Sequence, residues 1–301
     1  MSVHLVVGAG PVGTAVAKQL LADGETVRVL TRSGSGPEGT QRISADAADA
    51  SALTAAADGA AAIYNCVNPP YHQWAELWPP VAAALIRAAE NTGAVLATTG
   101  NLYVYGPVDR PMTEDMPMAA TGTKGKVRAA MTRDALDAHA QGRIRAFEVR
   151  GSDYLGGNSL LSTIATPALR KGRTAYVPAD LDAPHTWTNV EDVAQLLVTG
   201  ARDERAWGGV WHVPSVDPVS IRDLVGIAAR QLGAQPKVKA IPYPALWTIG
   251  LFQPFVRELR ETQHQFRKPF VLDSSAAQQT FGLRPRPLEE SVALDIAATP
   301  A

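Results

Sequence analysis

The sequence predicts an α/β fold in which a doubly wound parallel sheet is accompanied by a smaller lobe of mixed structure. Apolar, strand-like runs alternate with helix-like segments, a glycine-rich turn follows the first run, and the alternation loosens beyond about Gly151. Strands that pair in parallel need a crossover, usually a helix, so this alternation indicates a parallel sheet with helices on both faces. A chain of 301 residues can hold one such domain and a smaller appendage.

The predicted strands are short runs rich in apolar residues. They span 3–8, 26–32, 41–46, 61–67, 94–99 and 144–150. Apolar residues recur at helical spacing between several of these strands, at 12–21, 48–57, 74–91 and 121 to about 141.

The later part of the chain is expected to return once to this sheet. Residues 185–201 combine a strand end with a helix that carries Glu191 and Asp192 in its first turn, and 208–213 predicts a short strand. We therefore expect 1–153, rejoined by 184–213, to form the sheet domain. Residues 154–183 and 214–301 are expected to form the smaller lobe.

Composition limits the classes of partner. The 28 basic and 29 acidic residues give a net charge of -1, so the chain has no strong attraction to nucleic acid or to an anionic membrane, and a small-molecule partner is expected. The single cysteine, Cys66, excludes an internal disulfide, and the six histidines show no metal-ligand spacing, so no metal site is expected. Neither a signal peptide nor an apolar stretch of about 20 residues is found, which predicts a cytoplasmic protein without a membrane anchor. Whether it forms a homodimer is left open.

The glycine turn predicts a dinucleotide site. Gly8, Gly10 and Gly13 form a GxGxxG motif between a predicted strand and a predicted helix, with Pro11 and Val12 inside it. In this Rossmann arrangement the glycines allow a tight turn, close approach of a pyrophosphate and close helix packing, while the helix N-terminus favours negative charge. The alternative is a turn that needs glycine only for packing.

The end of the second strand favours NADP(H) over NAD(H). An acidic residue at this place would bind a ribose 2′-hydroxyl, but the chain has Thr31 and Arg32 there. The guanidinium of Arg32 could instead hydrogen-bond the 2′-phosphate that distinguishes NADP(H) from NAD(H). The alternative is that Arg32 is a solvated loop residue.

Several further segments carry a resemblance to a known family. "GAGPVG" is followed by Asp46 after the third strand, by "TTGNLYVYGP" at 98–107, "TEDMP" at 113–117, "RGSDYLGG" at 150–157 and "HTWTNVEDVAQ" at 185–195. In this order the segments resemble the extended and atypical short-chain dehydrogenases/reductases of the NAD-dependent epimerase/dehydratase type. The resemblance implies a Rossmann domain, a substrate-binding lobe in the C-terminal part, and hydride transfer to or from a carbonyl or hydroxyl carbon.

The chain departs from this family at its catalytic pair. The family uses a Tyr-x-x-x-Lys pair with a nearby serine or threonine, yet none of the seven tyrosines here has a lysine four residues later. Spacing from "TEDMP" puts Lys124 at the tyrosine position and Arg128 at the lysine position, four residues apart on one helix face. Alignment on "VYG" puts Asn101 at the serine position.

These substitutions leave several roles open. Lys124 could exchange a proton with substrate, anchor a substrate or cofactor group, or lie on a solvated helix face. Arg128 can hydrogen-bond a ribose but cannot deprotonate, and Asn101 can polarise a carbonyl through its amide hydrogens. Tyr103 could replace the lost proton donor if it faces the nicotinamide; otherwise it packs under its loop.

Other candidates follow from strand ends and from the resemblance. The predicted cofactor contacts beyond the glycine turn are Thr31, Arg32, Asp46, Asn65, Cys66, Val67, Thr98, Thr99 and Asp153. The predicted substrate contacts are Tyr71, His72, Tyr105, Tyr154 and Trp187. Packing is the alternative for the aromatic residues, and Cys66 is expected to be a small buried group rather than a nucleophile. Two functions remain: an NADP(H)-dependent oxidoreductase or epimerase with an altered proton donor, or a dinucleotide-binding protein without redox turnover.

Overall fold

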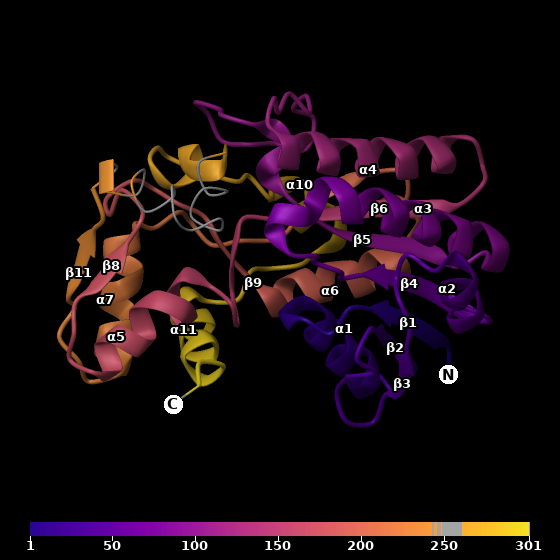
Figure 1. Cartoon of the computed structure of the whole chain (residues 1–301), viewed down its shortest axis with the longest axis horizontal. Helices are drawn as coiled ribbons and strands as arrows, with labels where there is room; N and C mark the ends of the chain where they lie inside the picture. The colour runs from indigo at the N-terminus through magenta and orange to yellow at the C-terminus, as the bar shows by residue number, and fades with distance from the viewer. Residues whose placement is uncertain (243, 246–247, 249–260, 301) are drawn as a thin grey trace.

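The structure is a computed structural model that describes residues 1–242, 244–245, 248 and 261–300. Its larger body is a seven-stranded sheet in the order β10-β6-β5-β4-β1-β2-β3 (Figure 1). Every neighbouring pair in this sheet is parallel. The strands are β1 (Val3–Val7), β2 (Thr26–Thr31), β3 (Gln41–Ser44), β4 (Ala60–Asn65), β5 (Val95–Asn101), β6 (Arg145–Gly151) and β10 (Val210–His212). The predicted doubly wound α/β fold is therefore confirmed.

Helices cover both faces of the sheet, which explains the apolar character of its strands. Figure 1 shows α2 (Ala50–Ala56), α3 (Trp74–Thr92) and α4 (Thr123–Ala140) along one side, and α1 (Pro11–Ala22) and α6 (Val190–Ala201) along the other. Each face of the sheet has its own buried apolar cluster. One cluster packs α1 and α6 against the sheet, and the other packs α2 and α3 against it. Strands buried on both faces have to be apolar almost throughout.

The sheet has its topological switch point between β1 and β4. From β1 the chain builds outward through β2 and β3 on one side, and from β4 through β5 and β6 on the other. Parallel α/β sheets bind ligands in the crevice outside the carboxyl ends of the strands at such a point. The glycine turn after β1 and Cys66 after β4 both lie here, because the Cys66 amide donates to the Val7 carbonyl oxygen.

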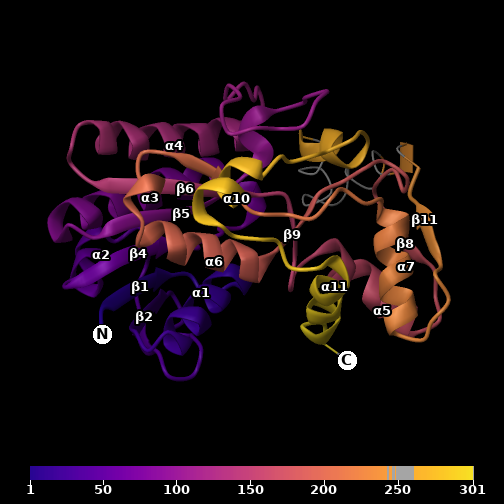
Figure 2. The ribbon, with the colours of Figure 1, turned by 180° about the vertical axis from the view of Figure 1, so that it is seen from behind.

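A smaller lobe stands beside one end of the sheet (Figure 2). It holds the parallel pairs β7–β9 and β8–β11 and a buried apolar cluster of its own. Its elements are β7 (Asp153–Leu155), η3 (Leu161–Ala165), α5 (Thr166–Arg170), β8 (Ala175–Val177), β9 (Trp187–Asn189), α7 (Ile221–Gln231), β11 (Val238–Ala240), η5 (Gln263–Phe266) and α11 (Leu288–Ala297). Helix α10 (Ser275–Phe281) returns to the sheet beside β10.

Short helical turns follow two of the central strands and bring polar and aromatic side chains to the switch point. Turn η1 (Tyr71–Gln73) lies between β4 and α3, and η2 (Leu102–Tyr105) follows β5 directly. The Asn101 side chain caps η2 by accepting a hydrogen bond from the Tyr103 amide at 3.2 Å. The turn η4 (Glu204–Ala206) lies away from these two, between α6 and β10.

Candidate active site

Two adjoining cavities open at the carboxyl ends of β1 and β4. The outer cavity has a volume of about 370 Å³ and the inner one about 310 Å³. They meet along residues that line both of them: Gly10, Pro11, Cys66, Val67, Asn68 and Asn158. In open α/β sheets of this kind, a crevice at the topological switch point is the usual place for a ligand.

Each of the three glycines of the turn has a different steric environment. Gly8 has a φ of +99°, and a Cβ there would lie 2.6 Å from the Cys66 carbonyl oxygen. A Cβ on Gly13 would lie 2.0 Å from the Gly8 carbonyl oxygen, so this glycine allows helix α1 to pack closely. A Cβ on Gly10 would meet nothing within 4 Å, because Gly10 caps the N-terminus of α1 and faces open space. The turn therefore fits a diphosphate against the helix N-terminus.

The outer cavity gathers the residues expected at the adenosine end. Thr31, Arg32 and Asp46 all line it. The Thr31 hydroxyl donates to the Ser35 carbonyl oxygen at 3.0 Å, and the Asp46 carboxylate accepts from the Ala48 amide at 2.9 Å. Arg32 is exposed. Its guanidinium is thus at the mouth of the cavity and can reach a ligand from solvent.

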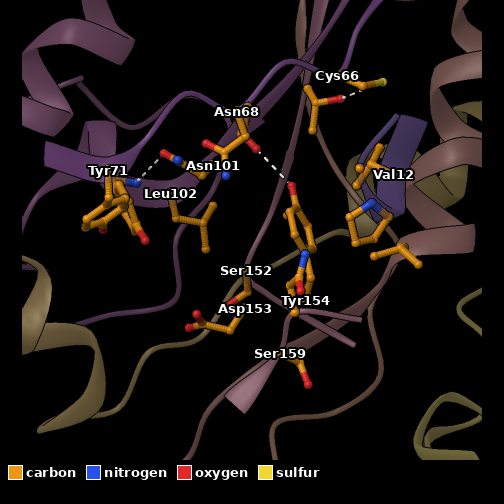
Figure 3. Close-up of a pocket in the computed structure, with 18 of the residues that line it drawn as sticks. Val12, Cys66, Asn68, Tyr71, Asn101, Leu102, Ser152, Asp153, Tyr154 and Ser159 are labelled. Atoms are coloured by element: carbon orange, nitrogen blue, oxygen red, sulfur yellow. Dashed lines mark hydrogen bonds between the residues drawn. The ribbon is translucent and has the colours of Figure 1, made fainter. Parts of the chain in front are cut away.

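The inner cavity brings together most of the remaining predicted residues (Figure 3). Its wall includes Val12, Tyr71, Thr99, Asn101, Tyr103, Arg128, Asp153 and Tyr154. In the view of Figure 3, Tyr71 and Asn101 lie on one side of Tyr154, and Val12 and Cys66 lie on the other. Burial raises the pKa of the Cys66 thiol to about 12, so this sulfur is a neutral part of the wall rather than a thiolate nucleophile.

Arg128 is buried in the wall of the inner cavity. Its guanidinium carbon lies 4.9 Å from the Trp74 ring centre and 4.3 Å from that of Trp78, and Nη1 donates to the Thr99 carbonyl oxygen at 3.0 Å. Among the residues that the structure describes, none accepts a hydrogen bond from its Nε. Burial lowers the pKa of Arg128. An unpartnered donor on a buried side chain that lines a cavity can serve a ligand.

Lys124 is buried on the same helix face but does not line either cavity. Its backbone amide donates to Glu261 Oε1 at 2.6 Å, and its Nζ lies 3.3 Å from Glu261 Oε2. The Nζ also lies 4.6 Å from the centre of the Tyr71 ring. The ammonium group thus joins the smaller lobe to the cavity wall, with Tyr71 between it and the cavity.

Tyr71 and Tyr103 form the aromatic side of the inner cavity. Their rings meet edge to face with centres 6.3 Å apart, and the Tyr71 hydroxyl donates to the Thr262 hydroxyl from the smaller lobe at 3.5 Å. Burial raises the pKa of both tyrosines, and the neighbouring Tyr71 and Asp153 raise the pKa of Tyr103 further. Both hydroxyls are therefore protonated at neutral pH.

Tyr154 occupies space that a side chain at position 151 would need. Its hydroxyl donates to the Gly100 carbonyl oxygen at 3.0 Å, and burial raises its pKa. A Cβ on Gly151 would lie 2.5 Å from Tyr154 Cε1. The glycine and the tyrosine therefore form a matched pair, and the Tyr154 ring is fixed in the cavity wall.

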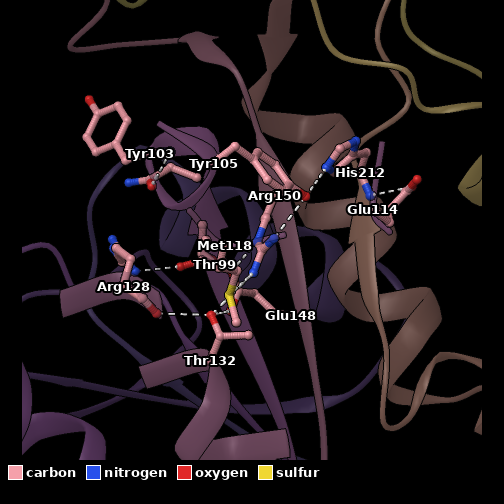
Figure 4. Close-up of polar contacts among 12 residues, drawn as sticks. Thr99, Tyr103, Tyr105, Glu114, Met118, Arg128, Thr132, Glu148, Arg150 and His212 are labelled. Carbon is pink, nitrogen blue, oxygen red and sulfur yellow. Dashed lines mark hydrogen bonds and ion pairs between the residues drawn. The ribbon is translucent and has the colours of Figure 1, made fainter. Parts of the chain in front are cut away.

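Tyr105 lies outside both cavities, in a buried polar network at the end of β6 (Figure 4). Arg150 Nη1 donates to the Tyr105 hydroxyl at 2.9 Å, and this hydroxyl lies 2.8 Å from His212 Nε2. Arg150 Nε donates to Glu148 at 2.7 Å, and Glu148 also accepts from the Thr132 hydroxyl. These contacts account for the hydrogen-bonding capacity of Tyr105, so it holds β6 and β10 together.

The structure places several other predicted residues away from the two cavities. Trp187 is buried in the lobe, with its indole nitrogen donating to Val219, and His72 is exposed. Asn65 uses its side chain to accept the Val67 amide at 3.3 Å, and so orients a residue that does line both cavities. Thr98 lies with Asn65 around a separate void of about 20 Å³ on the α3 side.

Sequence reasoning missed three features of the site. Asn68 and Asn158 line both cavities, and Gln265 lines the inner one. Asn68 follows strand β4 closely in sequence. The argument that selected Cys66 and Val67, their place after the carboxyl end of this strand, therefore applies to Asn68 as well. Asn158 and Gln265 come from loops of the smaller lobe, where no periodic pattern marks a position as facing a ligand.

Over the described ranges, no helix is long and apolar enough to cross a bilayer. The same residues contain no group of three or more His, Cys, Asp or Glu side chains that could hold a metal ion.

Solved structures of similar fold cover nearly the whole chain. MoeE5 in complex with UDP-glucose and NAD matches at 20% identity with a TM-score of 0.79, covering 99% of this chain and 98% of that one. UDP-glucose 4-epimerase of Thermotoga maritima matches at 15% identity with a TM-score of 0.80, covering 98% of each chain. DesIV, a dTDP-glucose 4,6-dehydratase of Streptomyces venezuelae with NAD bound, matches at 19% identity with a TM-score of 0.77. The match covers 97% of this chain and 96% of that one. At these identities the likeness shows the fold alone.

A family model matches the sequence directly. No curated protein matches the chain. The model described as the NAD dependent epimerase/dehydratase family matches residues 4–211, which span the sheet from β1 to β10 and include the glycine turn and both cavity-lining strand ends. This confirms the resemblance found in the sequence motifs. The chain belongs to the NAD-dependent epimerase/dehydratase family.

Proposed function

We propose that the protein is an NADP(H)-dependent oxidoreductase or epimerase that acts on a carbonyl or hydroxyl group of a small molecule. The observation that carries this proposal is the continuity of the two cavities, from the Gly10 turn to a wall containing Asn101 and Tyr103. A nicotinamide bound there would supply or accept the hydride. The family and the fold support enzymatic activity of this general kind.

Asn101 is proposed to polarise the substrate oxygen. Its Oδ1 already accepts the Tyr103 amide, so the Nδ2 hydrogens are the half of the side chain left to donate. The residue lines the inner cavity at the end of β5. A fixed amide donor of this kind stabilises negative charge that develops on a carbonyl oxygen.

Tyr103 is proposed to supply the proton in place of the missing family tyrosine. Its raised pKa keeps the hydroxyl protonated, and ring contacts with Tyr71 and Trp74, at 6.3 and 6.1 Å between centres, hold it at the cavity wall. A protonated phenol can donate to a developing alkoxide but is a poor base. The proposal therefore favours carbonyl reduction over alcohol oxidation at neutral pH. Lys124, behind Tyr71, is assigned a positioning role.

Arg128 is proposed to bind the nicotinamide ribose. It lines the inner cavity, and the two tryptophan rings and the Thr99 carbonyl restrict its orientation. Its unpartnered Nε and remaining hydrogens can donate to ribose oxygens, although a guanidinium cannot act as a base near neutral pH.

The NADP(H) preference is proposed from the outer cavity. Arg32 at the end of β2 supplies a fork of donors suited to a phosphate, and no acidic side chain lies at that strand end. Asp46 is acidic, but it follows β3 and accepts the Ala48 amide. The family description and the NAD-bound MoeE5 structure support a nicotinamide dinucleotide without supporting this preference.

The proposal is tested by adding carbonyl compounds to the protein and NADPH, and following the near-ultraviolet absorbance of the reduced cofactor. Tyr103→Phe and Asn101→Ala are expected to lower turnover by about a hundredfold each, with cofactor binding retained. The matched control is Tyr176→Phe, because Tyr176 is exposed and outside both cavities. If a broad panel of carbonyls and alcohols leaves the bound cofactor unchanged, the oxidoreductase proposal fails.

A dinucleotide-binding protein without turnover is the second candidate. The observation that favours it is the engagement of Lys124 by Glu261, because the residue in the tyrosine position is held outside both cavities. This function predicts tight NADP(H) binding together with the absence of any cofactor oxidation or reduction.

A further inference from the structure

The loop from Gly156 to Ser159 crosses the N-terminus of α1 where the two cavities meet. Gly156, Gly157 and Asn158 have φ angles of +117°, +119° and +55°. A Cβ on Gly157 would lie 3.4 Å from Pro11 Cγ, so the loop lies directly against the first turn of α1. A segment that begins the smaller lobe is thus placed over the glycine turn of the sheet domain.

A buried carboxylate holds this loop in place. Asp295 on α11 accepts hydrogen bonds from the Gly156 and Gly157 amides at 2.7 and 3.0 Å, and from the Ser159 hydroxyl at 2.9 Å. Asp295 is 0% exposed. Because these amides are already bonded to Asp295, the loop backbone there has little capacity for a ligand. Asn158 is the exposed residue of this loop, so its side chain can reach a ligand in the cavities.

Asn158 is the only non-glycine residue with a positive φ in the part of the chain that the structure describes. This conformation is costly for most side chains, although asparagine tolerates it better than most. Such residues cluster at ligand clamps, where surrounding contacts impose the conformation. Here Asn158 is exposed and lines both cavities.

The chemistry of the junction restricts what Asn158 can bind. The residues shared by the two cavities carry no charged side chain, and Asn68 and Asn158 supply the only side-chain amides among them. The junction faces the N-terminus of α1, whose first-turn amides and dipole favour an anion. A group that lies between an adenosine end and a nicotinamide end, next to these amides, is the diphosphate.

We propose that Asn158 binds the cofactor diphosphate through its side-chain amide, from the side opposite the N-terminus of α1. The smaller lobe then contributes directly to cofactor affinity, and Asp295 is a positioning residue that holds Asn158 over the glycine turn. This rests on the dinucleotide site of the proposed function, but it requires no hydride transfer and no knowledge of the substrate.

The test compares affinities for NADPH, ADP and adenosine by calorimetry. Asn158→Gly keeps the backbone conformation and removes the amide, so it is expected to weaken NADPH and ADP by about tenfold and to leave adenosine unchanged. Asn158→Asp keeps the shape and adds a negative charge, so ADP affinity should fall further. Wild-type ADP affinity in both variants would overturn the proposal.

Asp295 is tested through its effect on Asn158. Asp295→Asn is expected to weaken ADP binding, and adding Asn158→Gly to it should cause a smaller further loss than Asn158→Gly causes alone. Full additivity of the two changes would overturn the positioning role. If Asp295→Asn does not fold, the Asn158 variants still decide the diphosphate contact. Failure of the hydride-transfer proposal would appear as intact, Asn158-dependent binding without turnover, so the two failures are distinguishable.

Discussion

His185 Nε2 lies 2.7 Å from Asp153 Oδ2, and this pair connects the wall of the inner cavity to the aromatic interior of the smaller lobe. His185 is 2% exposed and stacks on Phe266, with ring centres 5.6 Å apart and planes within 5°. Asp153 itself lines the inner cavity. The contact therefore fixes a carboxylate in the cavity wall, beside the hydroxyls of Tyr71 and Tyr103 that respond to its charge.

This carboxylate is predicted to select against anionic substrates. Benzamide and benzoate have nearly the same shape, so we expect the cofactor-loaded protein to bind benzamide about tenfold more tightly. Asp153→Asn can still accept a hydrogen bond from His185, and it should remove the difference. Titration calorimetry measures both ligands, with Asp109→Asn, on an exposed loop, as the control. A preference that survives Asp153→Asn would rule out this role.

The Lys124–Glu261 pair is predicted to stabilise the fold rather than to carry out chemistry. Lys124→Met and Glu261→Gln should each lower the free energy of unfolding by about 1–3 kcal/mol, because each removes the charge attraction of an ion pair whose side chains are 3% and 25% exposed. Their effects should be less than additive, and urea denaturation of the two single variants and the double variant measures this. Loss of turnover in Lys124→Met with normal turnover in Glu261→Gln would instead identify Lys124 as the proton donor.

Arg32 is predicted to determine the choice of cofactor. Arg32→Ala should weaken NADPH by about tenfold or more and leave NADH almost unchanged, because only NADPH carries the 2′-phosphate. Calorimetric titration of both cofactors measures the ratio. Arg42→Ala, on the exposed strand β3, is the matched control. Equal affinity of the wild-type protein for the two cofactors would contradict the proposed preference.

His212 is predicted to make the protein less stable in acid. Burial lowers its pKa from 6.5 to about 4, and its Nδ1 lies 2.8 Å from the Asp273 carbonyl oxygen while Nε2 faces the Tyr105 hydroxyl. In the unfolded chain the imidazole gains its proton near pH 6.5, whereas the folded protein resists it. Stability is therefore lost as the pH falls from 6.5 toward 4, by about 3 kcal/mol in total.

The test of His212 needs a control, because Asp192 changes the stability of the fold with pH in the opposite direction. Burial raises the pKa of Asp192 to about 6, so its ionisation destabilises the fold as the pH rises from 3.8 toward 6. The test is the difference between wild-type and His212→Gln unfolding free energies across this range. The variant should show a shallower loss in acid. Parallel profiles would show that His212 does not titrate as expected.

The sheet domain was largely predictable because its signals are local. Each strand is an apolar run, and the GxGxxG turn stands between a strand and a helix, so both the parallel sheet and the expected diphosphate site follow from neighbouring residues. Apolar runs do not record which residues make the last hydrogen bonds of a strand. The predicted ends therefore differ by one or two residues from those of each strand from β1 to β6.

Polar contacts of the site were less predictable because their partners are distant in sequence. Lys124 meets Glu261, 137 residues away, and Tyr105 meets His212, 107 residues away. Spacing alone placed Lys124 in the tyrosine position. Glu261, which accepts a hydrogen bond from its ammonium group, comes from the weakly patterned smaller lobe. In the same way, the loop that carries Asn158 is held through Gly157, which donates to Asp295 and lies against Pro11, and no local pattern encodes these contacts.

The two indole rings around Arg128 have an experimental consequence. Trp74 lines the inner cavity, and Trp78 lies behind it, 0% exposed, with ring centres 6.2 Å apart. Tryptophan emits in the spectral region where a reduced nicotinamide absorbs, so a cofactor bound in this cavity should quench the fluorescence of these rings by energy transfer. The chain thus carries its own optical reporter of occupancy, which can follow binding in real time without any label and before a substrate is known.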